Sequence, residues 1–491
     1  MDLIQLLALM PLLIVGGVSI VLMLLIAFVR NHALTCFVTC IGLLAAMLTS
    51  INTIGDGIIQ VTPLLVMDDF TRVFCALMIG ISLAASWMAY TYMEASDEIR
   101  EEYYILLALA ALGGCVLIAS NHFASMFIGI ELLSVSLFAM VGYMVHGGKS
   151  SDITLEGGVK YMIMSGVSSS FLLFGVALIY AYAGILTIDF LAAPAGATLS
   201  QGYLIVGTSM LIIGLAFKLS WVPFHMWTPD VYQGAPAPVT GFLASGAKIA
   251  VFAFLIRFLI ASGPDRIDLL LAGLTIMAVL SMLLGNLMAL LQSNLKRLLA
   301  YSSVAHMGYM MVALIAAIKT GNISEDVAAE AIGVYMVAYA LMTLLAFAVL
   351  SRLAALNSEY ETGNIEMYGG LLYRHPWMAT CMFVAFLGLI GMPLTAGFIG
   401  KYYLMLAGVD QQLWTLLWVL VAGSALGLYY YLKVILVMCK ESQDDAPAEL
   451  ETPVASGFSG VLISGLCLMV LYVGIYPTPV IDWIQLALAS L

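Results

Sequence analysis

Charged side chains are scarce in this sequence. Asp, Glu, Lys and Arg together make up 9% of the 491 residues, whereas 63% are hydrophobic. A soluble domain carries roughly 25% charged residues, and a larger core cannot close that gap. Lipid must therefore be the solvent along most of the chain. Because the apolar runs are too long for barrel strands, the predicted fold class is an all-α polytopic membrane protein.

The sequence also lacks the patterns that hold metal ions and redox cofactors. Its seven cysteines are dispersed, and Cys36 and Cys40, one helical turn apart in an apolar run, are typical of small core residues. The six histidines are dispersed as well, which disfavours an enzyme with its own haem or quinone site. We therefore expect no metal and no cofactor in this chain. No basic patch occurs either, so no nucleic-acid partner is expected.

The first apolar run is not expected to be a cleavable signal. It extends from Leu3 to Val29, which is longer than the apolar part of a signal peptide, and no basic residue precedes it. We expect it to be the first of about fourteen membrane spans, each with roughly 20 apolar residues. The spans are predicted near 3–29, 33–54, 70–93, 103–120, 122–145, 158–182, 203–222, 239–261, 267–291, 298–318, 330–353, 377–407, 413–439 and 457–476. A short amphipathic tail, Pro477 to Leu491, is predicted to follow.

The basic residues of the loops predict the orientation of the chain. Eight of them fall in odd-numbered loops and three in even-numbered loops. The eight are Arg30, Arg100, Lys149, Lys296, Arg297, Arg352, Arg374 and Lys440, and the three are Arg72, Arg266 and Lys319. Because basic loops stay on the cytoplasmic side, both termini are predicted to be periplasmic.

The other six of the seventeen basic residues fall within predicted spans. They are Lys160, Lys218, Lys248, Arg257, Lys401 and Lys433. Each charge at the centre of a spanning helix costs roughly 2.5–3.5 kcal/mol on insertion scales. Lys160, Arg257 and Lys433 lie near span ends, and a side chain that reaches the lipid headgroups is a sufficient explanation for them.

The remaining lysines, Lys218, Lys248 and Lys401, lie deeper in their spans. Glu131 is the acidic counterpart, about 14 Å into its own span at 1.5 Å per residue. A structural ion pair is one interpretation, but three lysines outnumber one glutamate. A proton relay is the other, because a buried lysine can gain and lose its proton. His306, in the run YSSVAHMGY (301–309), fits a hydrogen-bonded core residue and a relay member about equally well.

Prolines are expected to break two of the spans. Pro223 follows Lys218 by five residues, and Pro393 precedes Lys401 by eight. A proline removes a helical hydrogen bond, and such a break at membrane depth is tolerated where protein covers it or where it lines a water-filled cavity. Each predicted break therefore lies beside a buried lysine.

Four stretches of the sequence carry a family resemblance. They are FKLSWVPFHMWTPDVYQGAPAPV (217–239), GIELLS (129–134), NLKRLLAYSSVAHMGY (294–309) and GFIGKYY (397–403). They resemble the antiporter-like membrane subunits of bacterial respiratory complex I. The resemblance extends over essentially the whole chain. The VYQGAPAP wording resembles the N type among these subunits rather than the L and M types.

The resemblance implies a fold of fourteen helices with two inverted five-helix repeats. The seventh and twelfth spans would be discontinuous. The implied divisions are an N-terminal unit (1–100), a first repeat (101–263), a second repeat (264–441), and a last span with the C-terminal tail (442–491).

The resemblance also implies roles for the buried charges. Glu131 on the fifth span would pair with Lys218 on the broken seventh span, and Lys248 would connect them to Lys401 on the broken twelfth span. Lys401 resembles the terminal lysine of the N and L types, where the M type has a glutamate.

The implied function is that of a proton-translocating subunit of NADH:quinone oxidoreductase in the bacterial inner membrane. NADH, FMN, iron–sulfur clusters and quinone would belong to partner subunits. The expected neighbours are the antiporter-like M subunit and the small K, J and A subunits, with lipid around them. A subunit of a multisubunit sodium/proton antiporter is the alternative, and the 217–239 stretch argues against it.

The first prediction concerns topology. A cysteine introduced at Gln485 should react with a membrane-impermeant thiol reagent in intact cells, because the C-terminal tail is expected in the periplasm. A cysteine introduced at Asp445, in an odd-numbered loop, should react only after the cells are opened. The reverse pattern would overturn the orientation.

Overall fold

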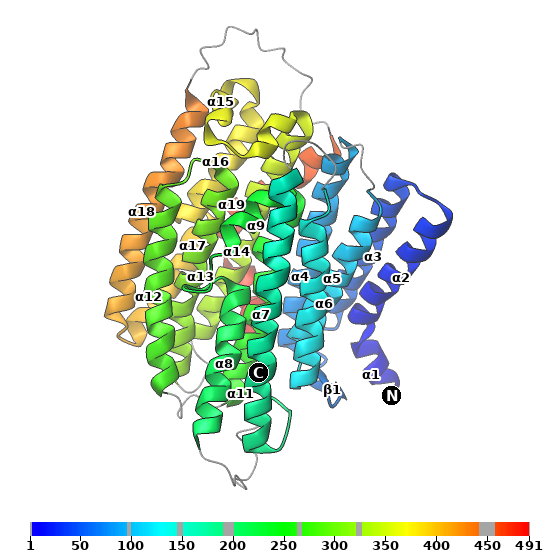
Figure 1. The fold of residues 1–491 in the computed structure, drawn as a ribbon, viewed down its shortest axis with the longest axis vertical. Helices are drawn as coiled ribbons and strands as arrows, with labels where there is room; N and C mark the ends of the chain where they lie inside the picture. The colour runs from blue at the N-terminus through cyan, green and yellow to red at the C-terminus, as the bar shows by residue number, and fades with distance from the viewer. Residues whose placement is uncertain are drawn as a thin grey trace.

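The computed structural model describes residues 2–95, 100–144, 151–189, 201–262, 268–320, 327–440 and 457–490. Helices dominate these residues, and they lie side by side along the long axis of the molecule (Figure 1). The α-helices are α1 (Leu3–Ala8), α2 (Met10–Phe28), α3 (His32–Asn52), α4 (Asp69–Glu94), α5 (Glu102–Ile118), α6 (Phe123–Val141), α7 (Ser151–Ala183), α8 (Gln201–Leu219), α9 (Thr228–Gly234), α10 (Ala237–Phe242), α11 (Lys248–Ser262), α12 (Asp268–Leu290), α13 (Leu295–Thr320), α14 (Val327–Leu356), α15 (Leu371–Arg374), α16 (Pro376–Ile390), α17 (Ala396–Asp410), α18 (Trp414–Cys439), α19 (Phe458–Ile475) and α20 (Thr478–Leu488). Shorter elements are the π-helix η1 (Leu243–Ala247), the 3-10 helices η4 (Ser358–Thr362) and η5 (Ile365–Tyr368), and the strands β1 (Ile59–Thr62) and β2 (Leu65–Met67).

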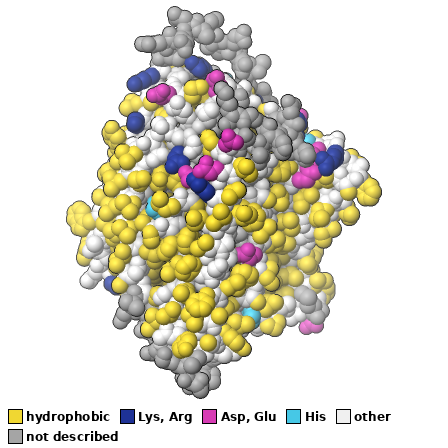
Figure 2. All heavy atoms as spheres, in the orientation of Figure 1, with side chains coloured by type: hydrophobic (Ala, Val, Ile, Leu, Met, Phe, Trp, Pro, Cys, Tyr) yellow, Lys and Arg dark blue, Asp and Glu magenta, His cyan; other side chains and the backbone are white. Residues whose placement is uncertain are grey.

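The predicted all-α polytopic membrane fold is confirmed. Among the described residues, eleven helices are long and apolar enough to cross a membrane, and α19 with α20 forms a further pair bent by 81°. The shorter helices α5 and α16 are also apolar. Figure 2 shows hydrophobic side chains over the middle of the face in view, with many of the charged ones gathered toward its upper end. This distribution suits a belt of lipid around the helices.

The two ends of the chain lie at the same end of the bundle (Figure 1). The side chain of Gln5 donates to the carbonyl of Gln60 in β1 at 3.3 Å, and Phe70 N at the start of α4 donates to Ser490 Oγ at 3.0 Å. Strands β1 and β2 form an antiparallel hairpin directly before α4. The sequence analysis did not predict this hairpin, which occupies the connection between α3 and α4.

Two of the predicted spans are discontinuous, as expected. Helix α8 ends at Leu219 and α9 begins at Thr228, with Pro223 between them; α16 ends at Ile390 and α17 begins at Ala396, with Pro393 between them. A third irregularity was not predicted. The π-helix η1 lies within the span that contains Lys248 and ends one residue before it.

The same neighbours pack closely in both predicted repeats. Helices α5 and α6 approach through Gly113 and Gly129, where an added Cβ would lie 2.5 Å from Leu133 N and 2.8 Å from Leu117 N. Helices α12 and α13 approach in the same way through Gly285 and Gly308, whose added Cβ atoms would lie 2.7 Å from Ala305 N and 2.9 Å from Met282 N. Small residues permit such close contact between spanning helices. The first two helices of each predicted repeat therefore pack closely through a pair of glycines.

Arg257 does not reach the lipid headgroups, so that explanation was wrong. Its guanidinium binds the Asp68 carboxylate through two hydrogen bonds of 2.7 and 2.8 Å, and a third of 2.9 Å goes to Thr71 Oγ1. The side chains of Arg257 and Asp68 are only 8% and 3% exposed. The pair joins the beginning of α4 to α11, which lie in the predicted N-terminal unit and the predicted first repeat respectively.

This buried pair generates the second prediction. Asp68→Asn should keep an oxygen that caps Thr71 N but leave Arg257 without a counterion, which lowers the free energy of unfolding by about 3–5 kcal/mol. Denaturant unfolding of the purified protein in detergent measures the change. Arg30→Gln is the control, because the Arg30–Glu102 pair is exposed and such a pair is worth about 1 kcal/mol or less. Equal effects of the two substitutions would contradict the stabilising role of the buried pair.

Candidate functional site

Glu131 and Lys218 lie in one polar cluster between α6, α7 and α8. Ser169 of α7 donates to a carboxylate oxygen of Glu131. The Lys218 ammonium, in the last turn of α8, donates to Ser134 Oγ at 2.7 Å and to Ser165 Oγ at 2.6 Å. In the part of the chain that the structure describes, no direct ion pair joins Glu131 to Lys218. The two charged groups instead contact different serines, Ser169 for Glu131 and both Ser134 and Ser165 for Lys218.

Helical spacing explains why these serines meet. Ser134 follows Glu131 by three residues, and Ser169 follows Ser165 by four, so each pair lies on one face of its helix. The Ser169 hydroxyl is also 3.0 Å from the carbonyl oxygen of Ser165. Ser165 therefore lies between the two groups, with its carbonyl facing Ser169 and its hydroxyl accepting from Lys218.

A pocket of about 180 Å³, a volume that includes open space, lies beside this cluster. Its polar lining comes from Ser165, Ser168 and Lys218, and aromatic rings such as Tyr161 and Trp227 cover the rest. The space open to a water molecule within this pocket is at the lower limit of what one water molecule beside Lys218 needs.

Lys248 lies in a second cluster, deep in the protein at 1% exposure. Its ammonium donates to Ser303 Oγ of α13 at 2.6 Å and lies 5.8 Å from the centre of the Tyr232 ring. Ser303 Oγ is in turn 2.6 Å from Tyr339 Oη of α14. The π-helix η1 directly precedes Lys248, and π-turns inside α-helices are frequent at functional sites.

His306 is buried one turn beyond Ser303 on α13. Its Nδ1 atom is 2.6 Å from Tyr335 Oη, and its ring meets the Tyr309 ring edge-on with 5.5 Å between the ring centres. The Tyr339 ring lies on another side, with a centre-to-centre distance of 5.4 Å. His306 therefore lies among tyrosines rather than beside a carboxylate.

Lys401 closes the break between α16 and α17. Its ammonium donates to the carbonyl of Ile390, the last residue of α16, at 2.7 Å, and to Ser424 Oγ of α18 at 3.2 Å. The last carbonyls of a helix lack helical partners and attract cations. The Tyr309 ring lies 5.0 Å from the ammonium. Among the described residues no carboxylate pairs with Lys401.

Helix α13 brings the second cluster together, and its apolar stretch is buried entirely. Ser303, His306 and Tyr309 follow one another at three-residue steps and face Lys248, Tyr335 and Lys401. Lys248, Lys401 and the α13 residues between them thus lie in one continuous region, and Glu131 and Lys218 lie in another. Among the described side chains, no hydrogen bond connects the cluster around Lys218 to the cluster around Lys248.

Several polar partners were missed from the sequence. Ser165 and Ser169 carried a signal that could have been used, since two serines four residues apart in an apolar run mark one polar stripe. Tyr335 and Tyr339 repeat the same spacing on α14. Asn286, which donates to Tyr309 Oη at 2.8 Å, gave no such signal.

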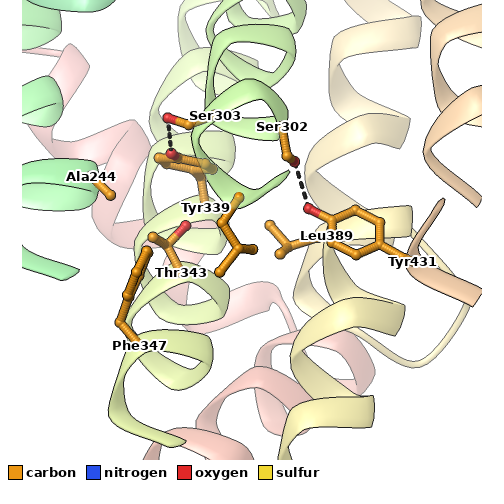
Figure 3. A pocket seen from close by; sticks show the side chains of 9 residues that line it. Ala244, Ser302, Ser303, Tyr339, Thr343, Phe347, Leu389 and Tyr431 are labelled. Carbon is orange, nitrogen blue, oxygen red and sulfur yellow. Dashed lines mark hydrogen bonds between the residues drawn. The ribbon is translucent and has the colours of Figure 1, made fainter. Parts of the chain in front are cut away.

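A pocket of about 210 Å³, again including open space, lies among α13, α14, α16, α18 and η1. Figure 3 shows Ser303 facing Tyr339 and Ser302 facing Tyr431 in this pocket, with Thr343 one turn from Tyr339 on α14. The two hydrogen bonds measure 2.6 and 2.5 Å. Five hydroxyl groups thus line a cavity that begins at the only described hydrogen-bond partner of Lys248.

Comparison with known proteins assigns the chain to a family. Residues 120–427 match the model for the transmembrane part of the NADH:quinone oxidoreductase/Mrp antiporter family. NADH-quinone oxidoreductase subunit N of Ectopseudomonas mendocina (strain ymp) is 43% identical over 493 aligned positions, which cover 98% of this chain and 96% of that protein. The chain belongs to the subunit N family of NADH-quinone oxidoreductases. Its resemblance to the antiporter-like subunits of complex I is therefore confirmed.

Solved structures share the fold of this chain. A chain of respiratory complex I from Thermus thermophilus with bound aureothin superposes with a TM-score of 0.78 and 32% identity, over 96% of this chain and 98% of that one. A chain of the membrane-bound sulfane sulfur reductase, an archaeal respiratory membrane complex, has a TM-score of 0.85 at 23% identity, and one of the Mrp complex from Dietzia sp. DQ12-45-1b has 0.82 at 20%. These two cover 99% of this chain and 97% of their own. At such identities they show that the fold is shared.

The polar cluster around Glu131 and Lys218 in this subunit N family member generates the third prediction. Glu131→Ala and Lys218→Ala should both reduce NADH-driven proton transport by about tenfold or more, because each removes a group that holds or accepts a proton. Glu131→Asp should be milder if water fills the added distance. Ser170→Ala is the control, since Ser170 is an exposed neighbour on α7 whose hydroxyl donates to its own helix. Normal transport by an assembled complex carrying Glu131→Ala would remove Glu131 from the relay.

Proposed function

We propose that this chain carries protons across the membrane through Glu131, Lys218, Lys248 and Lys401, with His306 as an intermediate group. Transport is driven by electron transfer from NADH to quinone in partner subunits. The observation that carries this proposal is the surroundings of the three lysines. Hydroxyl groups and a main-chain carbonyl accept hydrogen bonds from their ammonium groups. None of these acceptors bears a charge that would hold the proton permanently.

The two clusters suggest an order of events. Glu131 and Lys218 receive a proton in the first repeat, and Lys248 holds it at the centre of the bundle. His306 and the tyrosines around it lie between Lys248 and Lys401. Lys401, at the second break, exchanges the proton with the periplasmic side. Both broken helices thus place an ammonium group where backbone and hydroxyl groups can solvate it.

The orientation and location belong to the same proposal. The chain lies in the bacterial inner membrane with both termini in the periplasm. The eight-to-three distribution of basic loop residues supports this orientation. The contacts of Gln5 and Ser490 support the placement of both termini on one side of the membrane, because they put them at the same end of the bundle.

The division of labour with other subunits completes the proposal. NADH, FMN, the iron–sulfur clusters and quinone are held by partner subunits, and the M, K, J and A subunits are the membrane neighbours. The boundaries at 100/101, 263/264 and 441/442, which separate the four parts of the chain, remain predictions. A sodium/proton antiporter subunit is the second candidate, and the Mrp structure supports it only at the level of the fold. Purification of the native complex should therefore recover NADH-oxidising partners.

Lys401 generates the fourth prediction. Lys401→Arg should allow assembly but reduce NADH-driven acidification of inverted membrane vesicles by about tenfold or more, because arginine keeps the charge and does not release its proton. Lys433→Arg on α18 is the matched control, since it makes the same exchange at an exposed position in the same bundle. Wild-type acidification with Lys401→Arg would leave Lys401 a structural residue.

A further inference from the structure

The only described route of direct hydrogen bonds from Lys248 passes through one serine. Ser303 Oγ has three polar neighbours: Lys248 Nζ at 2.6 Å, Tyr339 Oη at 2.6 Å and Tyr232 Oη at 3.3 Å. All four side chains are buried. A hydroxyl group has one proton to donate and two lone pairs to accept with. When the ammonium donates to Ser303, the Ser303 proton is free to point to a tyrosine, and Tyr339 is the closer one.

Tyr339 then faces the hydroxyl-lined pocket. The pocket of about 210 Å³ is bounded by Tyr339, Thr343 and Ser302 and by apolar groups such as Phe347 and Leu389 (Figure 3). A cavity with several polar groups on its wall is the kind that holds ordered water. Tyr232, in contrast, is not among the residues that line this pocket. The two tyrosines that share Ser303 therefore differ in where a proton can go next.

We propose that Ser303 and Tyr339 form a hydroxyl relay through which protons leave Lys248, and that water in the adjoining pocket is the next acceptor. This inference rests on the proposed function, because it takes Lys248 as a proton carrier. It adds two relay residues that neither the buried charges nor the helix breaks pointed to.

Each transfer moves one proton from Lys248 to the pocket along these hydrogen bonds. An N–H bond of Lys248 breaks as an O–H bond forms on Ser303; the original Ser303 proton moves to Tyr339 Oη, and the original Tyr339 proton moves to a pocket water molecule. Three bonds to hydrogen break and three form. One positive charge moves from Lys248 to the water, and no electron is transferred. Rotation of the two hydroxyl groups restores the starting arrangement before the next proton.

Removal of single hydroxyl groups tests the relay. Tyr339→Phe and Ser303→Ala in the complete complex should each lower NADH-driven acidification of vesicles by about tenfold or more, within the range that one proton-transfer group contributes. Tyr232→Phe removes an equivalent hydroxyl from the same serine and keeps the ring beside Lys248, so its effect should be clearly smaller. Tyr368→Phe in η5 is the control and should have no effect. The buried Tyr368 hydroxyl donates to the Tyr360 carbonyl oxygen and does not contact Ser303. Equal losses with Tyr339→Phe and Tyr232→Phe would overturn the relay.

A second measurement separates proton transfer from packing. Site-specific 3-fluorotyrosine at position 339 keeps the shape of the side chain but makes the phenol a stronger acid. The relay requires that the solvent deuterium isotope effect on acidification change with this substitution at 339 and stay at its wild-type value with the same substitution at 232. An unchanged isotope effect at 339 would make Tyr339 a packing residue.

Lys248→Ala separates this inference from the proposed function. If Lys248→Ala abolishes transport but Tyr339→Phe does not, the relay fails and the proposed function stands. If Lys248→Ala leaves transport intact, the proposed function fails and the relay fails with it.

Discussion

A charged group in a membrane must find hydrogen-bond partners within the protein, and the arrangement of this bundle follows from that constraint. An ammonium at the centre of a spanning helix has no water to solvate it. The three central lysines meet the requirement with serine hydroxyls and a main-chain carbonyl. A carboxylate would stabilise each charge more strongly, but it would also hold the proton. Neutral acceptors solvate the ammonium and still leave proton release within reach.

The broken helices supply the same kind of solvation from the backbone. The end of α16 leaves the Ile390 carbonyl without a helical partner, and the Lys401 ammonium takes that place. Close packing is needed around such a gap, because unsatisfied backbone groups cannot face lipid. An added Cβ at Gly397 would lie 1.9 Å from the Gly388 carbonyl oxygen, so α17 and α16 meet there without space for a side chain. The break is thus both the source of the polar group and the reason for the tight packing around it.

Arg257 differs from the central lysines because its partner is charged. Arg257 has a carboxylate partner in Asp68 with two short hydrogen bonds, and it joins two parts of the chain. Arginine retains its proton under all ordinary conditions, so a permanent counterion suits it. The three central lysines thus have neutral partners, whereas the buried cations Arg257, Arg72 and Lys296 have carboxylate partners. This division also explains why a single rule for charges near span ends was wrong at Arg257.

Composition and the length of the apolar runs determined that this chain is an all-α membrane protein, because 9% charged residues place it in lipid and the runs are too long for barrel strands. Local sequence also determined the breaks at Pro223 and Pro393 and the position of Lys218, Lys248 and Lys401 within spans, where Lys218 is partly buried and the other two are buried. Only the tertiary structure decided what those lysines touch. Ser303 and Tyr339 meet through the packing of α13 on α14, and Ser134 and Ser165 meet Lys218 across three helices. Spacing along one helix specifies a face, but it does not specify which face of another helix lies opposite. The separate serine partners of Glu131 and Lys218, the pairing of Arg257 with Asp68 and the hydroxyl-lined pocket all depend on how different helices pack against one another.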